Sequence, residues 1–188
     1  MKNKARCEWC LKDPIYIDYH DKEWGIPVHD DKLLFEFLVL ESFQAGLSWL
    51  TVLKKRENFR KAFANFDAKK VSKFDKKKFD ELMQDAGIIR NRLKIEAAIN
   101  NAARYLEIQK EFGSFDKYVW SFVKGKTIVN KRKSLGNVPP KTAESDAMSK
   151  DMGKRGFKFR GSTICYAFMQ ATGIVDDHVD HCWKKSKK

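Results

Sequence analysis

Two short clusters near opposite ends of the chain carry most of the side chains that bind metals well. The first is YHDKEWG at 19–25, the second is HVDHC at 178–182, and Cys7 and Cys10 lie just upstream of the first. Structural zinc sites use four cysteine or histidine ligands in a tetrahedral array. Two half-sites so far apart in sequence indicate that the ends of the chain meet. We therefore expect one structural zinc ion to join them.

The spacing of the candidate ligands leaves alternatives open. His178 and Cys182 are four residues apart, so a helical turn would direct both side chains the same way. Cys7 and Cys10 form a CxxC pair without a second pair, and spacing does not choose between them as the partner of His20. His181 is a further candidate. The alternative to a metal site is a set of scattered buried cysteines and surface histidines.

Glu41 is the second residue that could do chemistry. It follows Leu38 by three residues and Leu34 by seven, and so falls on the apolar stripe of a helix, whereas Glu36 is expected on the polar face. Burying an unpaired carboxylate is costly, so such a group either has a charged partner or a raised pKa. Glu41 is thus either half of a buried ion pair or an acceptor for a polar or cationic ligand. Trp49, nearby, either stacks on a flat ligand or fills the core.

A glycine-bounded hairpin at 154–163, KRGFKFRGST, lies between two expected helices. Its two glycines permit a sharp turn. The second helix would begin at Ser162, and the free N–H groups of a helix start attract anions. We expect the hairpin to hold a phosphate without reading sequence, through Gly156, Lys158, Arg160, Gly161, Ser162 and Thr163. A plain helix–helix turn with solvated lysines is the alternative.

The periodicity that must position these groups is helical almost throughout. Apolar stripes predict helices over 31–45, 48–63, 79–86, 95–106, 114–122, 143–152 and 162–172. Asp30 or Asp31 is expected to cap the first helix. Residues 123–142 break the pattern in a basic loop that is either a contact arm or an exposed connection. No alternating strand pattern is visible. We predict an all-α single domain over 1–188, with a basic tail from about 184.

Composition favours a polyanionic partner; the alternative is a positive charge that serves general solubility or reflects a composition bias of the host. The 188 residues include 38 Lys and Arg against 25 Asp and Glu, a net charge of +13, together with five Trp, five Tyr and 14 Phe. Positive charge releases counterions from phosphates, and aromatic rings stack on bases. No apolar run is long enough to span a membrane, and the N-terminus lacks a secretory signal. Without a secretion signal, disulfides are not expected. We expect a cytoplasmic monomer associated with DNA.

Several longer segments resemble one known family. They are YHDKEWG at 19–25, ESFQAGLSWLTVLKKR at 41–56, DAGIIR at 85–90, VWSFV at 119–123 and RGFKF at 155–159, followed by His178 and Cys182. Together they resemble the bacterial DNA-3-methyladenine glycosylase I family, over nearly the whole chain. The resemblance implies an all-α helix-hairpin-helix glycosylase fold. It also implies one zinc ion at the termini, held by Cys7, His20, His178 and Cys182, with Cys10 as an extra thiol.

The resemblance further implies a reaction and a pocket. The enzyme would flip an alkylated base out of double-stranded DNA, hydrolyse its N-glycosidic bond and release 3-methyladenine, leaving an abasic site. No lysine nucleophile stands out, so strand cleavage is not expected. Leu47 would probe the gap left in the duplex. Asp177 is the nearest acid by position to the sugar-side aspartate of related enzymes, and we assign it no role. The pocket would consist of Glu41 as the base-recognising carboxylate, Tyr19 and Trp49 against the base, and Trp9, Tyr16 and Trp24 nearby.

Two other classes of protein compete with this interpretation. A non-catalytic nucleic-acid-binding module held together by zinc explains the charge, the hairpin and the metal ligands, but it does not explain a carboxylate on an apolar stripe near Tyr19 and Trp49. A zinc hydrolase would need an open position on its metal for water, whereas four protein ligands leave none.

Overall fold

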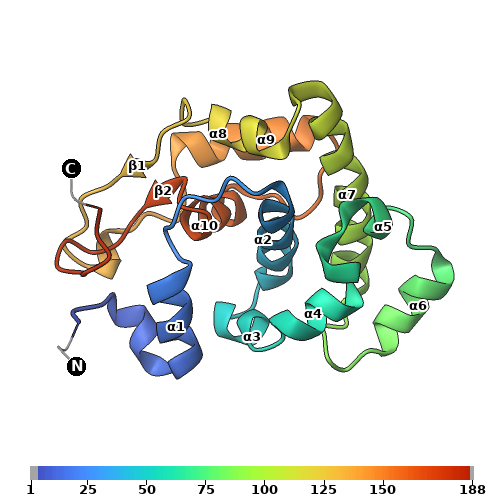
Figure 1. Cartoon of the computed structure of the whole chain (residues 1–188), viewed down its shortest axis with the longest axis horizontal. Helices are drawn as coiled ribbons and strands as arrows, with labels where there is room; N and C mark the ends of the chain where they lie inside the picture. Colours follow the sequence, from blue (N-terminus) through green and yellow to red (C-terminus); the bar gives the residue numbers. More distant parts are fainter. Residues whose placement is uncertain (1–3, 187–188) are drawn as a thin grey trace.

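The structure is a computed structural model that describes residues 4–186, and most of that range is helical (Figure 1). No helix in this range is long and apolar enough to cross a lipid bilayer. Within residues 4–186 the elements are η1 (Glu8–Lys12), α1 (Pro14–Lys22), α2 (Asp31–Gln44), α3 (Trp49–Leu53), α4 (Arg56–Ala62), η2 (Ala64–Phe66), α5 (Ala68–Val71), α6 (Lys76–Gln84), α7 (Arg92–Phe112), α8 (Phe115–Ser121), β1 (Ile128–Val129), η3 (Leu135–Asn137), α9 (Ala143–Lys154), α10 (Ser162–Ala171) and β2 (Val175–Asp176).

Helix α2 forms the centre of the core. Every residue from Leu34 to Phe43 is buried, and α2 packs against α3, α7, α8 and α10. Of the two expected caps, Asp30 closes the helix, because its carboxylate accepts a hydrogen bond from the Leu33 N–H at 2.7 Å. The Asp31 carboxylate instead accepts the backbone N–H groups of Phe115 and Asp116 at 3.0 and 2.8 Å. Asp31 therefore joins the start of α2 to the start of α8.

The predicted helices are largely found, with differences at their ends. The segment predicted as one helix over 48–63 is two, because α3 ends at Leu53 and α4 begins at Arg56. Helix α6 ends at Gln84, two residues before the predicted end. Helix α1 was not predicted, although Asp13 as N-cap followed by Pro14 is a typical start signal.

The two ends of the described chain lie side by side, at the left of Figure 1. The Trp183 N–H donates to the Ala5 carbonyl at 2.8 Å. Nearby, β1 and β2 pair in parallel, with Ile128 opposite Val175. The prediction of a strictly all-α fold is therefore wrong in this detail. Sequence analysis missed the two strands because strands of two residues are too short to produce an alternating pattern. Of the predicted basic tail, residues 187–188 lie outside the described part of the chain.

Glu36 is not on a polar face, contrary to expectation. It is only 5 % exposed. Its carboxylate accepts hydrogen bonds from Arg56 Nε at 2.6 Å and Arg60 Nη2 at 2.7 Å, and Arg56 also binds Glu23 at 2.6 Å. The prediction failed because α2 is buried on all sides and has no polar face at this level. The resulting charge cluster ties α2 to α4.

Loss of Glu36 should therefore weaken the fold. We expect Glu36→Ala to lower the free energy of unfolding by about 3 kcal/mol, because it leaves Arg56 buried with a partner missing. Glu57→Ala, which removes an exposed partner of Arg60, should cost less than about 1 kcal/mol. Urea unfolding of both variants measures the difference. Equal losses would show that the buried cluster contributes no more than a surface pair.

Candidate active site

A pocket of about 220 Å³ lies between the N-terminal helices, the end of α2 and the C-terminal segment. Its wall also includes Leu135 and Val138, from the segment predicted as a basic loop. A concave, largely apolar site with a few polar groups is the usual form of a small-ligand site. All six residues that sequence analysis assigned to a base pocket line it: Trp9, Tyr16, Tyr19, Trp24, Glu41 and Trp49.

The aromatic side chains of the pocket pack on one another across separate elements. The Tyr19 ring, on α1, lies 5.4 Å from that of Trp49, at the start of α3, with an interplanar angle of 50°. Trp9 meets Trp24 edge-on at 5.1 Å. The Tyr16 hydroxyl accepts the Leu50 N–H at 2.8 Å and so fixes α1 against α3. The packing of α1 on α3 therefore brings the rings of Tyr19 and Trp49 together.

Glu41 projects from α2 into this aromatic pocket and has no partner. It is 3 % exposed, and its Oε2 atom is buried without a hydrogen bond. Within residues 4–186 no Lys or Arg pairs with it, so the buried ion pair considered from sequence belongs to Glu36 instead. Burial raises the pKa of Glu41 to about 8. The Trp49 Nε1 atom is also buried and unpartnered. The pocket thus offers a ligand one acceptor and one donor that the protein leaves unused.

Three of the expected metal ligands converge beside the pocket. The ligand atoms of Cys7, His20 and Cys182 lie within 4.8 Å of one another, and all three residues are buried. The Cys10 thiol is buried too, but it donates to the Cys7 carbonyl at 3.1 Å and lies outside this group. The structure thus places Cys7, and not Cys10, with His20. His181 lines the pocket instead.

His178 stands next to these three residues but is not within their 4.8 Å group. Its ring centroid lies 5.1 Å from that of His20, and its Nε2 atom is buried without a partner. A side chain at Gly25, whose φ is +74°, would collide with the His178 ring at 2.6 Å. The segment from His178 to Cys182 is an irregular turn, with the Cys182 N–H bound to the Val179 carbonyl at 2.8 Å. The helical turn considered for His178 and Cys182 is therefore not found.

His20 and His178 each have one ring nitrogen hydrogen-bonded to a carboxylate. His20 Nδ1 lies 2.9 Å from Asp21 Oδ1, and His178 Nδ1 lies 2.8 Å from Asp176 Oδ1. The Nε2 atom of His178 has no partner, whereas that of His20 lies 3.4 Å from Cys182 Sγ. Carboxylates in this position orient the histidine ligands of metal sites. Asp21 is itself held by Arg6 at 2.8 Å.

The surroundings of Cys7 and Cys182 favour one thiolate, on Cys182. The hydrogen bond from Cys7 lowers the pKa of Cys182, and His20 lowers it further against the opposing effect of burial. The same hydrogen bond, together with burial, raises the pKa of Cys7. The thiolate is the metal-binding form of cysteine, so the donor set is already partly prepared.

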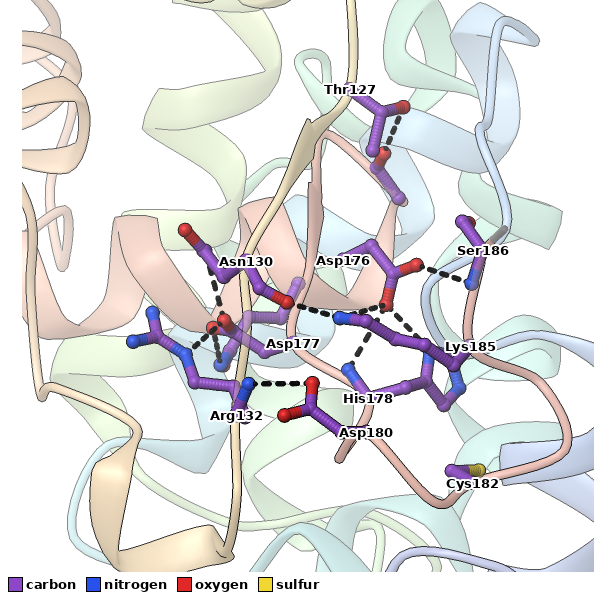
Figure 2. Close-up of polar contacts among 12 residues, drawn as sticks. Thr127, Asn130, Arg132, Asp176, Asp177, His178, Asp180, Cys182, Lys185 and Ser186 are labelled. Atoms are coloured by element: carbon purple, nitrogen blue, oxygen red, sulfur yellow. Dashed lines mark hydrogen bonds and ion pairs between the residues drawn. The ribbon is translucent and has the colours of Figure 1, made fainter. Parts of the chain in front are cut away.

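Residues 127–132 of the basic segment are hydrogen-bonded to the C-terminal segment (Figure 2), whereas most of residues 133–141 are exposed. Asn130 and Arg132 donate to Asp177 Oδ1 at 2.9 and 2.7 Å. Arg132 and Asp180 exchange two further hydrogen bonds, at 2.8 and 3.0 Å. Asp177 also accepts from Gln170 at 2.8 Å and from the hydroxyl of Tyr166. These contacts position η3, whose Leu135 lines the pocket.

The residues expected to touch DNA lie on two turns. Leu47 is 41 % exposed in the turn between α2 and α3. In the hairpin between α9 and α10, the carbonyls of Gly156 and Lys158 accept hydrogen bonds from Asn100 and Asn101, both at 2.9 Å. Helix α10 begins at Ser162 as predicted. Lys158, Gly161 and Thr163 are exposed, and the guanidinium of Arg160 lies over Gly153. Contact of these residues with DNA stays a prediction.

The chain matches the model of the methyladenine glycosylase family over residues 9–185. It is 53 % identical to DNA-3-methyladenine glycosylase 1 of Escherichia coli over 94 % of this chain and 95 % of that one. A crystal structure of a 3-methyladenine DNA glycosylase I superposes with a TM-score of 0.94 at 48 % identity, covering 97 % of this chain and all of the other. The fold is thus that of a DNA glycosylase. The chain belongs to the methyladenine glycosylase family.

A second solved structure shows what a similar protein binds. It is a tyrosine-to-phenylalanine variant of a 3-methyladenine DNA glycosylase I in complex with 3-methyladenine. It is 40 % identical to this chain, with a TM-score of 0.93 and coverage of 97 % of this chain and 98 % of that one.

The unpaired carboxylate has a consequence for stability. The pKa of folded Glu41, about 8, lies above its ordinary value of 4.5. The free energy of unfolding should therefore fall as pH rises from about 4.5 to about 8, by up to about 1.4 kcal/mol per pH unit. Glutamine stays neutral, so Glu41→Gln should be more stable than wild type at pH 8 and by much less at pH 5. Urea unfolding at both pH values measures this. A variant less stable at both would reveal a stabilising partner of the carboxylate.

Proposed function

We propose that this protein is a monofunctional DNA glycosylase that releases 3-methyladenine from alkylated double-stranded DNA and leaves an abasic site. The observation that carries the proposal is Glu41, a buried carboxylate without a partner in an aromatic pocket. Membership of the methyladenine glycosylase family and the 3-methyladenine complex of a similar protein support the choice of base. A non-catalytic DNA-binding module would have no need for such a costly group.

The pocket chemistry suits a cationic base. Methylation at N3 gives adenine a positive charge, which already weakens its bond to the sugar, so the enzyme needs little acid catalysis. In the free pocket Glu41 is mostly protonated at pH 7, since its pKa is about 8. A cationic base beside it would favour the carboxylate form, with the proton released to solvent water. Tyr19 and Trp49 would attract the same charge through their ring faces.

Access to the base requires that it leave the helix. Extrusion of a base costs a few kcal/mol, and less for a damaged pair. We propose that Leu47 enters the gap left in the duplex, while Gly156, Lys158, Arg160, Gly161, Ser162 and Thr163 hold a backbone phosphate. The net charge of +13 strengthens binding to DNA as a whole. No lysine lines the pocket within residues 4–186, which supports base removal without strand cleavage.

We propose that one structural zinc ion joins the two ends of the chain through Cys7, His20, His178 and Cys182. The donor set supports this, because two buried sulfur and two buried nitrogen ligands are what a closed zinc site requires. The unpartnered Nε2 atom of His178 supports the fourth ligand. Zinc would there supply folding energy rather than chemistry. We further propose a monomeric single domain over 1–188 that works on DNA in the cytoplasm.

The proposed reaction is tested by base release from methylated duplex DNA, with free bases separated by chromatography and strand breaks scored in parallel. Wild type should release 3-methyladenine and leave the strand unbroken. Glu41→Gln should lose about 100-fold or more in rate while it binds DNA as before, and the surface variant Glu57→Gln should match wild type. A wild-type protein that binds DNA and zinc tightly but releases no base would establish the binding module instead.

The proposed metal site is tested by exchanging each thiol of the CxxC pair. Cys7→Ser should lose most of the bound zinc and lower the melting temperature, since a closed structural site contributes to folding. Cys10→Ser is the matched control and should keep about one zinc per chain. Metal content by mass spectrometry and thermal unfolding give both readouts. Zinc retained in Cys7→Ser but lost in Cys10→Ser would move the ligand assignment to Cys10.

A further inference from the structure

Lys94, in the first turn of α7, is buried and bound only to main-chain carbonyls. It is 6 % exposed, and its ammonium donates to the carbonyl of Phe43 at 2.7 Å and to that of Ala45 at 2.5 Å. Within residues 4–186 no carboxylate pairs with it. Lysine is rarely buried without a charged partner. A contribution to the surface charge therefore does not explain why Lys94 is buried here.

The two carbonyls lie at the C-terminal end of α2. The last carbonyls of a helix have no partner within the helix and carry partial negative charge. Lys94 satisfies the carbonyl of Phe43 in the last turn and that of Ala45 just beyond it. It thus caps α2 from another helix, in place of a local capping residue.

The capped end of α2 leads directly into the turn that carries Leu47. Gly46 adopts a φ of +78°, and the Leu47 N–H returns to the Gln44 carbonyl at 2.6 Å. Ser48 then caps α3 through the Thr51 N–H at 3.2 Å. The turn is held at its far side by α3 and at its near side by Lys94. Between these two anchors Leu47 is 41 % exposed.

We infer that Lys94 is a positioning residue for base extrusion. It fixes the end of α2 so that Leu47 stands out from the surface at the height needed to enter the duplex. The inference rests on the proposed glycosylase function and on the proposed role of Leu47. It does not involve Glu41, which lies earlier on α2 and, within residues 4–186, has no hydrogen bond or ion pair with Lys94.

The chain contains a matched control for this role. Lys55 also donates to two main-chain carbonyls, those of Ala86 at 2.9 Å and Gly87 at 3.3 Å. Lys55 is half-buried where Lys94 is buried, but it makes the same kind of hydrogen bonds at a connection that lines no part of the pocket. Loss of Lys55 reports the general effect of removing a lysine that caps carbonyls.

The test compares Lys94→Met, Leu47→Ala, the double variant and Lys55→Met. Two quantities are measured for each: the rate of 3-methyladenine release from duplex DNA and, by tryptophan fluorescence, the Kd for free 3-methyladenine. Lys94→Met should lower the rate about 10-fold or more and change the Kd by less than about twofold. Leu47→Ala should do the same, and in the Lys94→Met background it should cost less than about twofold further, because the two changes act on one step. Lys55→Met should match wild type in both.

Three results would overturn the inference. A parallel loss of base affinity and rate in Lys94→Met would mean that Lys94 acts on the pocket. Additive losses in the double variant would separate Lys94 from Leu47. Equal losses in Lys55→Met would mean a general effect on stability. If Lys94→Met does not fold, Lys94→Gln is judged by the same two quantities. Failure of the proposed function is distinct, since wild type would then neither bind nor release the base.

Discussion

The proposed activity depends on one arrangement that costs folding free energy, a carboxylate buried without a partner. Glu36 and Glu41 lie five residues apart on the same buried helix, yet Arg56 and Arg60 neutralise only the first. Glu41 is left facing aromatic rings, and burial raises its pKa to about 8. The rest of α2 must therefore be packed well enough to tolerate this group, and the run of buried side chains from Leu34 to Phe43 does so. A cationic base would relieve the cost that the empty pocket carries.

The pocket is made by parts of the chain that are distant in sequence. Its aromatic side chains come from η1, α1, the turn after α1 and α3, and its carboxylate comes from α2. The remaining wall comes from the segment after β1, from α10 and from the C-terminal segment. The cluster of Cys7, His20 and Cys182 lies where these parts meet. A zinc ion there would hold α1 and the C-terminal segment in register. This explains how a site without catalytic chemistry of its own would still matter for base binding.

Helix α7 supports both turns that are proposed to meet DNA. Lys94 caps the end of α2 before Leu47, and two turns further along Asn100 and Asn101 hold the hairpin between α9 and α10. Both turns are thus hydrogen-bonded to the same helix. In the proposed function, Leu47 and the hairpin between α9 and α10 act on the same stretch of duplex. Their common attachment to α7 would fix the distance between them.

The sequence by itself determined the helices with one apolar stripe, the ligand types at both ends, the hairpin between α9 and α10, and the position of Glu41 in the interior. These follow from local periodicity and from residue chemistry, which need no knowledge of neighbours. Only the tertiary structure decided that Glu36 is paired and Glu41 is not, and that Asp31 caps α8. Spacing left the choice between Cys7 and Cys10 open, and the structure places Cys7 beside His20, as the family resemblance implied. It also showed that residues 127–132 of the basic segment are hydrogen-bonded to the C-terminal segment. Each of these depends on a contact between residues far apart in the chain, for which sequence spacing carries no signal.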